Sequence, residues 1–169
     1  MRVVSNDGGA FVLENAFKTM KIQSKVRCAS DGSLIQEQYS SISGANTRTQ
    51  TLSFSGVAFP SAKQWVISGQ WAQSFKIKMI IGLGNPRGVQ LWTVKTASKT
   101  LSSENVSVPA GKFTALKVAQ TIDLELVTQD DTTPMKSTET TIAWYARGIG
   151  VVKSSSGKFT SMLTDFVKP

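Results

Sequence analysis

The segment Met20–Cys28 reads MKIQSKVRC, and its side chains alternate in character along the chain. The even positions are Met20, Ile22, Ser24, Val26 and Cys28, and the odd positions are Lys21, Gln23, Lys25 and Arg27. Successive side chains of a β-strand point to opposite faces, so this period of two predicts a strand with one face on a core and the other in water. We therefore expect Cys28, at the end of the apolar series, to be a small core residue.

The same alternation recurs along the chain. Within Phe75–Ile81, apolar residues alternate with Lys76 and Lys78. The strand expected over Phe113–Val127 has one apolar parity, made of Leu116, Val118, Ile122, Leu124 and Leu126. In a further strand, Thr140, Ile142 and Trp144 share a parity against Glu139 and Thr141. Helical periodicity is weak, and Gly8–Met20 is the one region where we expect a short helix. Strands at this spacing predict an all-β fold, with about ten strands in a strongly curved antiparallel sheet, a half-barrel or a barrel.

Turn-forming residues separate these runs. Asp31-Gly32 follows the first strand and is typical of a hairpin turn, and Pro109-Ala110-Gly111 predicts a tight reversal before Phe113. Gly82–Gly88 also lies between two expected strands, and its glycine spacing does not match a phosphate-binding loop. No linker or repeat interrupts the pattern, so residues 1–169 are expected to form a single domain.

The composition excludes several classes of enzyme and metal site. The chain has no His and one Cys among its 169 residues. Serine or cysteine nucleophiles activated by His are therefore absent, and an imidazole or multi-thiolate metal site cannot form within one chain. We expect no cofactor and no metal. No apolar run is long enough to cross a membrane.

Positive charge is concentrated in the first part of the chain. The net charge is +8, with 12 Lys and Arg against 4 Asp and Glu in residues 1–100, and 7 of each afterwards. If the strands that carry them are neighbours, one basic surface is predicted from Lys21, Lys25, Arg27, Lys76 and Lys78. Such a surface favours an anionic partner, although without interleaved aromatic rings the pattern does not favour nucleic acid. A solvated outer sheet face, where lysines block edge aggregation, explains the pattern equally.

Aromatic side chains are the candidates for ligand binding. Trp65 and Trp71 bracket Gly69 in a stretch that is rich in aromatic residues. The predicted ligand-binding residues are Trp65, Trp71, Trp92 and Phe75. Buried in a core, these rings would only fill space. Exposed, they would hold an apolar ligand or stack on a sugar.

Two ordered motifs carry a resemblance to a known group of proteins. Residues 106–118 read VSVPAGKFTALKV, and residues 144–153 read WYARGIGVVK. Together they resemble a family of uncharacterised bacterial exported proteins, often lipoproteins, with Arg147 where that family often has proline. The resemblance implies a strongly curved β domain similar to periplasmic lipoprotein carriers. It also implies export and brings no known catalytic residue.

These observations predict a non-enzymatic cell-envelope domain that binds an apolar or amphipathic ligand on the concave face of its sheet. A carbohydrate-binding or protein-interaction module that uses exposed Trp residues is the alternative. An enzyme using carboxylates or Lys, and a binder of anionic membrane surfaces, are further alternatives. Met1–Ser5 are too polar for a secretory leader, which fits either a cytoplasmic protein or a sequence that begins after a removed leader. Because the resemblance implies export, we expect an exported protein whose leader is absent from this sequence. A cytoplasmic protein is the alternative.

Overall fold

The computed structural model describes residues 2–7, 9–16, 20–43, 47–82, 88–157 and 159–165. Within these residues the regular structure consists of the strands β1 Arg2–Asp7, β2 Ala10–Ala16, β3 Met20–Cys28, β4 Leu34–Ser43, β5 Thr47–Gly56, β6 Gln70–Ile81, β7 Gly88–Val108, β8 Gly111–Thr128, β9 Met135–Ala146, β10 Gly150–Ser156 and β11 Phe159–Met162. A search of the same residues finds no helix suited to crossing a membrane.

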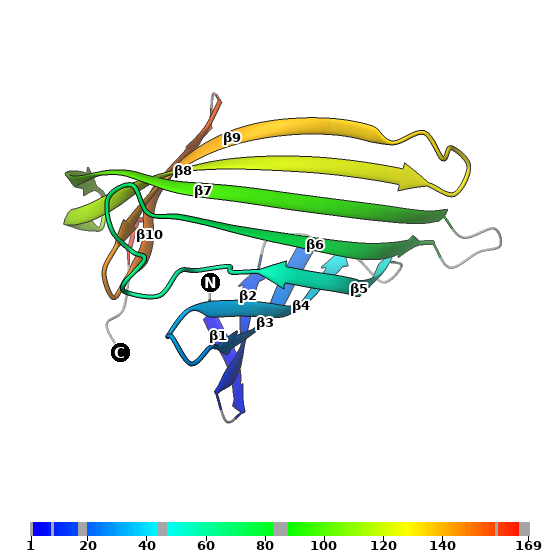
Figure 1. Ribbon diagram of the computed structural model, residues 1–169, viewed down its shortest axis with the longest axis horizontal. Coiled ribbons are helices and arrows are strands. Elements are labelled where there is room, and N and C mark those ends of the chain that lie inside the picture. The colour runs from blue at the N-terminus through cyan, green and yellow to red at the C-terminus, as the bar shows by residue number, and fades with distance from the viewer. Residues whose placement is uncertain are drawn as a thin grey trace.

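The strands form two antiparallel sheets. β1, β2, β3 and β4 form a four-stranded sheet in that order, and the order of the seven-stranded sheet is β11-β10-β9-β8-β7-β6-β5. Figure 1 shows long, bent strands from β5 to β9, with β10 crossing them at one end and the four-stranded sheet lying below β5. The predicted all-β fold with a curved antiparallel sheet is confirmed. The larger sheet stays open, with β11 and β5 as its edges.

The short helix expected within Gly8–Met20 is wrong for the described part of that segment. Ala10–Ala16 forms β2, which pairs with both β1 and β3. Ladder hydrogen bonds on both sides satisfy the backbone groups of β2, and this pairing outweighs a weak local helical pattern. Residues 17–19 lie outside the described part of the chain.

The turns predicted at Asp31-Gly32 and at Pro109–Gly111 lie where expected, whereas residues 83–87 of the expected Gly82–Gly88 turn lie outside the described part of the chain. Between β3 and β4, the backbone N–H and the hydroxyl of Ser33 donate to Asp31 Oδ1 at 2.9 and 2.6 Å. The hydroxyl bond and then the backbone bond hold the pKa of Asp31 below its ordinary value. Pro109-Ala110 joins β7 to β8, and Gly111 adopts a positive φ of 132° that glycine accepts without steric cost.

A β-bulge changes which face of the large sheet is buried. The register of β7 against β8 shifts between Thr100 and Ser102, which makes Leu101 an extra residue. Before the bulge, Thr100 lies opposite Val118, and both are fully buried. Beyond it, the buried side chains of β7 are Val106 and Val108, which point to the opposite side of the sheet. We call the face that carries Val118 the inner face and the other the outer face.

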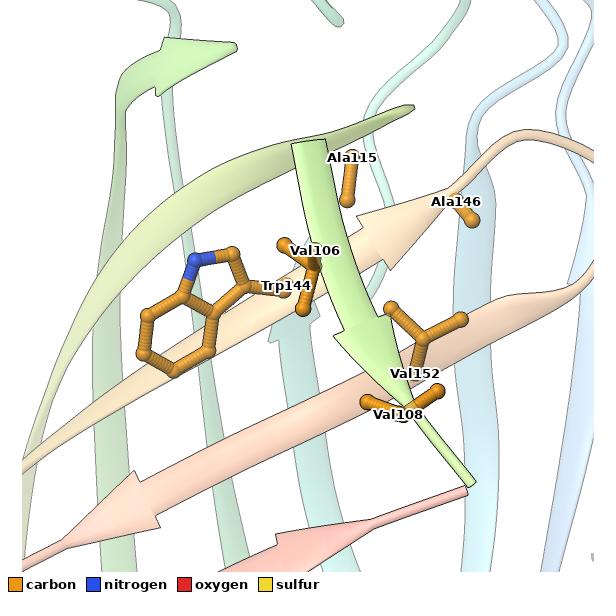
Figure 2. Close-up of a cluster of buried hydrophobic side chains, with 6 residues drawn as sticks. All are labelled: Val106, Val108, Ala115, Trp144, Ala146 and Val152. Carbon is orange, nitrogen blue, oxygen red and sulfur yellow. The ribbon is translucent and has the colours of Figure 1, made fainter. Parts of the chain in front are cut away.

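The main core cluster lies on the outer face near the β7–β8 turn. It consists of Val106, Val108, Ala115, Trp144, Ala146 and Val152. Figure 2 shows the two valines of β7 close to Val152 of β10, with the Trp144 ring beside them. The Trp144 indole N–H donates to Glu104, and the ammonium groups of Lys117 and Lys153 lie 5.3 and 4.7 Å from the ring centroid. Trp144 is therefore a structural residue.

Cys28 is exposed, so the expectation of a core position is wrong. Val26, two residues earlier on the same face of β3, is buried at 2% exposure. Cys28 is the last residue of β3, beside the hairpin turn, so it lies at the end of the strand and not in its buried middle.

Candidate functional site

Aromatic side chains gather on the inner face of the seven-stranded sheet. Trp71 and Phe75 share one face of β6 with Ile77. Trp92 of β7 lies directly opposite Ile77 and therefore points to the same face of the sheet. The Trp92 indole donates to Gln90 at 3.1 Å. All three aromatic side chains are half-buried. Three of the four predicted ligand-binding residues thus lie on one face of two neighbouring strands.

A stack of rings joins the two sheets on this face. The ring centroids of Phe54 of β5 and Phe75 are 5.5 Å apart, and the two ring planes differ by 6°. The Tyr39 ring of β4 also stacks on Phe75, with a centroid distance of 5.7 Å. Thr51 fixes β4 beside β5, because its hydroxyl donates to the Tyr39 carbonyl at 3.0 Å and accepts from the Tyr39 N–H at 2.9 Å. The four-stranded sheet therefore covers part of the inner face.

Residues 57–69, the loop between β5 and β6, bring the fourth predicted residue to the same face. The Trp65 ring lies 5.3 Å from Trp71 and 5.2 Å from Tyr145 of β9, and the Tyr145 contact is edge-to-face at 88°. Phe59 makes a second edge contact with Tyr145 at 6.2 Å. Backbone hydrogen bonds hold the far end of the loop to Thr100 of β7. The loop thus lies across the end of the sheet.

A cleft with a volume of about 460 Å³ opens between this loop and the sheet. Pro60, Ala62 and Trp65 line it from the loop, Leu116 and Tyr145 from β8 and β9, and Arg147 from the turn after β9. The volume falls within the range of small-molecule sites, and the wall is mainly apolar and aromatic. We call the space lined by these six residues, together with Ser103, Thr114 and Ala115, the loop–sheet cleft.

Tyr145 lines the loop–sheet cleft from β9 and is half-buried. Burial raises the pKa of its phenol above the ordinary value of 10.0, and a hydrogen bond with Gln120 acts in the opposite direction. Burial also raises the pKa of Tyr39 in the neighbouring stack. Both phenols are neutral at physiological pH, so neither repels an apolar ligand.

Alkaline unfolding should report the burial of Tyr145. Because folding raises its pKa, the stability that its neutral form contributes is complete below the unfolded pKa of about 10 and is lost as the pH rises through the folded value. The Tyr145→Phe variant should therefore lose less free energy of unfolding than the wild type between about pH 9 and pH 11. Urea titrations across this range measure the difference; parallel losses in the two proteins would contradict it.

The predicted basic residues do not form one surface. Lys21, Lys25 and Arg27 lie on β3 of the small sheet, whereas Lys76 and Lys78 lie on β6 of the large sheet. The condition for a shared surface, neighbouring strands, is not met, because β3 pairs with β2 and β4 and β6 pairs with β5 and β7. Glu37 also neutralises part of the first group, at 2.7 Å from Arg27 and 3.9 Å from Lys25.

A second, smaller cleft on the outer face contains two carboxylates. Asp123 and Glu125 line a volume of about 220 Å³ together with Lys95 and Lys136. Glu125 lies 3.7 Å from the Lys136 ammonium, and Asp123 accepts a hydrogen bond from Thr138 at 2.7 Å. Both carboxylates thus have polar partners on an open, charged surface. Within the described residues, no group of three or more potential metal ligands comes together.

Sequence reasoning missed Tyr145, Leu116 and Arg147 as cleft residues. Tyr145 and Arg147 stand in the WYARGIGVVK motif, which carries the family resemblance but no pattern that indicates ligand binding. Leu116 was interpreted only as part of an alternating strand. Their position in the cleft depends on the course of residues 57–69, which no period-two pattern describes.

Residues 2–161 match the family described as DUF3108-like. The chain belongs to that family. The match covers both sheets up to β11 and therefore includes the loop–sheet cleft of this DUF3108-like domain. Searches of curated proteins and of solved structures give no significant match.

Proposed function

We propose that this DUF3108-like domain is a non-enzymatic binding protein that holds an apolar or amphipathic ligand in the loop–sheet cleft. The observation that carries the proposal is the meeting of Trp65, Tyr145 and Leu116 around a cleft of about 460 Å³. Rings in edge contact leave an irregular apolar wall, which suits a flexible hydrocarbon chain. The neighbouring stack of Tyr39, Phe54 and Phe75 extends aromatic character along the same face.

The geometry favours a hydrocarbon ligand over a sugar. A stacking platform for carbohydrate needs exposed, roughly coplanar rings. The Trp65 and Trp71 planes are tilted by 36° at a centroid distance of 5.3 Å, and both residues are half-buried. Two tilted rings do not form one flat platform for a pyranose ring. The two Trp residues support an apolar wall better than a sugar platform.

Removal of the Trp65 ring should weaken ligand binding strongly. The test ligand is N-phenyl-1-naphthylamine, an uncharged apolar fluorophore, titrated into the wild type and into Trp65→Ala. Loss of a buried indole contact of about 1.5–3 kcal/mol corresponds to an affinity loss of roughly 10- to 100-fold. Fluorescence titration at fixed protein concentration gives both dissociation constants.

Trp144→Phe is the matched control, because Trp144 lies on the outer face of the sheet and does not itself line the loop–sheet cleft, although its cluster shares Ala115 with the lining. It should bind the fluorophore as the wild type does. If the wild type shows no saturable binding, the proposed function is wrong. If Trp65→Ala binds as tightly as the wild type, the ligand lies elsewhere and the cleft assignment is wrong.

We propose the cell envelope as the place where the domain acts. The support is the resemblance of residues 106–118 and 144–153 to exported proteins, together with a cleft suited to the single-chain amphiphiles that membranes supply. Fractionation of cells of the source organism, followed by immunodetection, tests this proposal. Detection in the cytoplasmic fraction alone would contradict it.

A further inference from the structure

Among the described residues that line the loop–sheet cleft, Arg147 is the only one with a formal charge. The residues that line the cleft include no Asp, Glu or Lys. Arg147 is exposed, and among the described residues the structure records no ion pair for it. An arginine without a carboxylate partner beside an apolar cavity offers its guanidinium donors to a ligand.

The chain places this charge at the end of the apolar wall. Arg147 follows the last residue of β9, only two residues after Tyr145, whose ring contacts Trp65. Ser103 and Thr114 line the same cleft, and the Thr114 hydroxyl donates to Asn105 at 2.9 Å. The cleft therefore joins an apolar wall to a rim with one guanidinium and two hydroxyl groups.

Building on the proposed function, we infer that the ligand is a single-chain amphiphile with an anionic head group, and that Arg147 recognises that head group. The hydrocarbon chain lies against Trp65, Leu116 and Tyr145, and the head group lies at the exposed rim. A planar guanidinium binds a carboxylate or a phosphate through two parallel hydrogen bonds, which neither a neutral nor a cationic head group can accept in the same way. The head group stays in contact with water, so no charge is buried without a partner.

Four ligands with the same twelve-carbon chain test this inference: dodecanoate, dodecyl phosphate, neutral tetraethylene glycol monododecyl ether and dodecyltrimethylammonium. Each ligand is titrated, at low salt and below the critical micelle concentration of that ligand, to displace N-phenyl-1-naphthylamine from the folded protein. The wild type should bind the two anions about tenfold or more tighter than the cation, as expected for a charge-assisted hydrogen bond. The tighter of the two anions indicates whether a fatty acid or a lysophospholipid is the better ligand class.

In Arg147→Gln the preference for anions should disappear, while the affinity for the neutral ether should stay within about twofold of the wild type. Lys99→Gln is the matched control. It removes one positive charge from an exposed position of β7 between Ser98 and Thr100, whose buried side chains point to the opposite, inner face. Its affinity for dodecanoate should match that of the wild type.

The outcomes separate this inference from the proposed function. If Arg147→Gln keeps the wild-type preference, or if Lys99→Gln loses it equally, Arg147 does not recognise the head group and the inference is wrong. The proposed function still stands in that case, because the neutral ether binds. If the wild type binds none of the four ligands, both proposals are wrong.

Discussion

Replacing Trp144 with alanine is expected to lower the free energy of unfolding by about 3–5 kcal/mol, the usual cost of deleting a large buried aromatic side chain. Trp144 is 8% exposed and packs in the outer-face cluster with Val106, Val108 and Val152. Its removal leaves a cavity and deprives Glu104 of the indole donor. Urea denaturation with linear extrapolation measures the loss.

Two further variants separate these contributions. Trp144→Phe keeps an aromatic ring in the cluster and should lose less stability than Trp144→Ala. Phe159→Ala removes a ring that is 82% exposed on the edge strand β11 and should change the free energy by no more than about 0.5 kcal/mol. A loss of less than about 1 kcal/mol in Trp144→Ala would show that the cluster does not contribute substantially to the stability of the sheet.

Period-two patterning predicted the class of this fold and several of its strands. Met20–Cys28 forms β3 within the predicted bounds, and the strand expected over Phe113–Val127 forms β8 with the bounds Gly111–Thr128. The apolar positions of that strand from Leu116 to Leu126 share one face, as expected, because alternation depends only on the extended backbone. The turn at Asp31-Gly32 was also predictable, because the preference for a turn is a property of the Asp-Gly pair itself.

The outer-face cluster could not be predicted in the same way. Its position depends on the bulge at Leu101, which turns the apolar side chains after it to the opposite face of β7. A second bulge at Val152 of β10 inserts a fully buried side chain into the same cluster. A bulge forms when two strands pair with unequal spacing, so it is a property of the pair and not of either segment alone.

The candidate site was predictable in its chemistry but not in its geometry. The aromatic residues Trp65, Trp71, Trp92 and Phe75 were recognised from their type, and the structure places them on one side of the large sheet. The contact between Trp65 and Tyr145 joins residues far apart in the sequence through a loop without regular structure. Arg147 becomes a candidate only after this contact closes one side of the cleft.

Replacing Gly56 with alanine is expected to cost about 2–5 kcal/mol of stability, from a left-handed backbone conformation and from overpacking. Gly56 ends β5 with a φ of +85°, and a Cβ atom there would lie 2.2 Å from the Ala72 carbonyl oxygen and 2.9 Å from the Gln73 Cα atom. Both atoms belong to the backbone of β6, so a side-chain rotation cannot relieve the contact. Urea denaturation measures the cost.

The same substitution should also weaken ligand binding, because Gly56 is where residues 57–69 leave the sheet toward the loop–sheet cleft. The next residue, Val57, donates its N–H to the Ala72 carbonyl at 2.8 Å, and a Cβ atom on Gly56 would push that carbonyl away. Gly88→Ala is the matched control, since among the residues that the structure describes its Cβ atom would meet nothing closer than 3.8 Å. Wild-type stability and affinity are expected for Gly88→Ala. If Gly56→Ala loses stability and keeps full affinity for N-phenyl-1-naphthylamine, the start of the loop does not position Trp65.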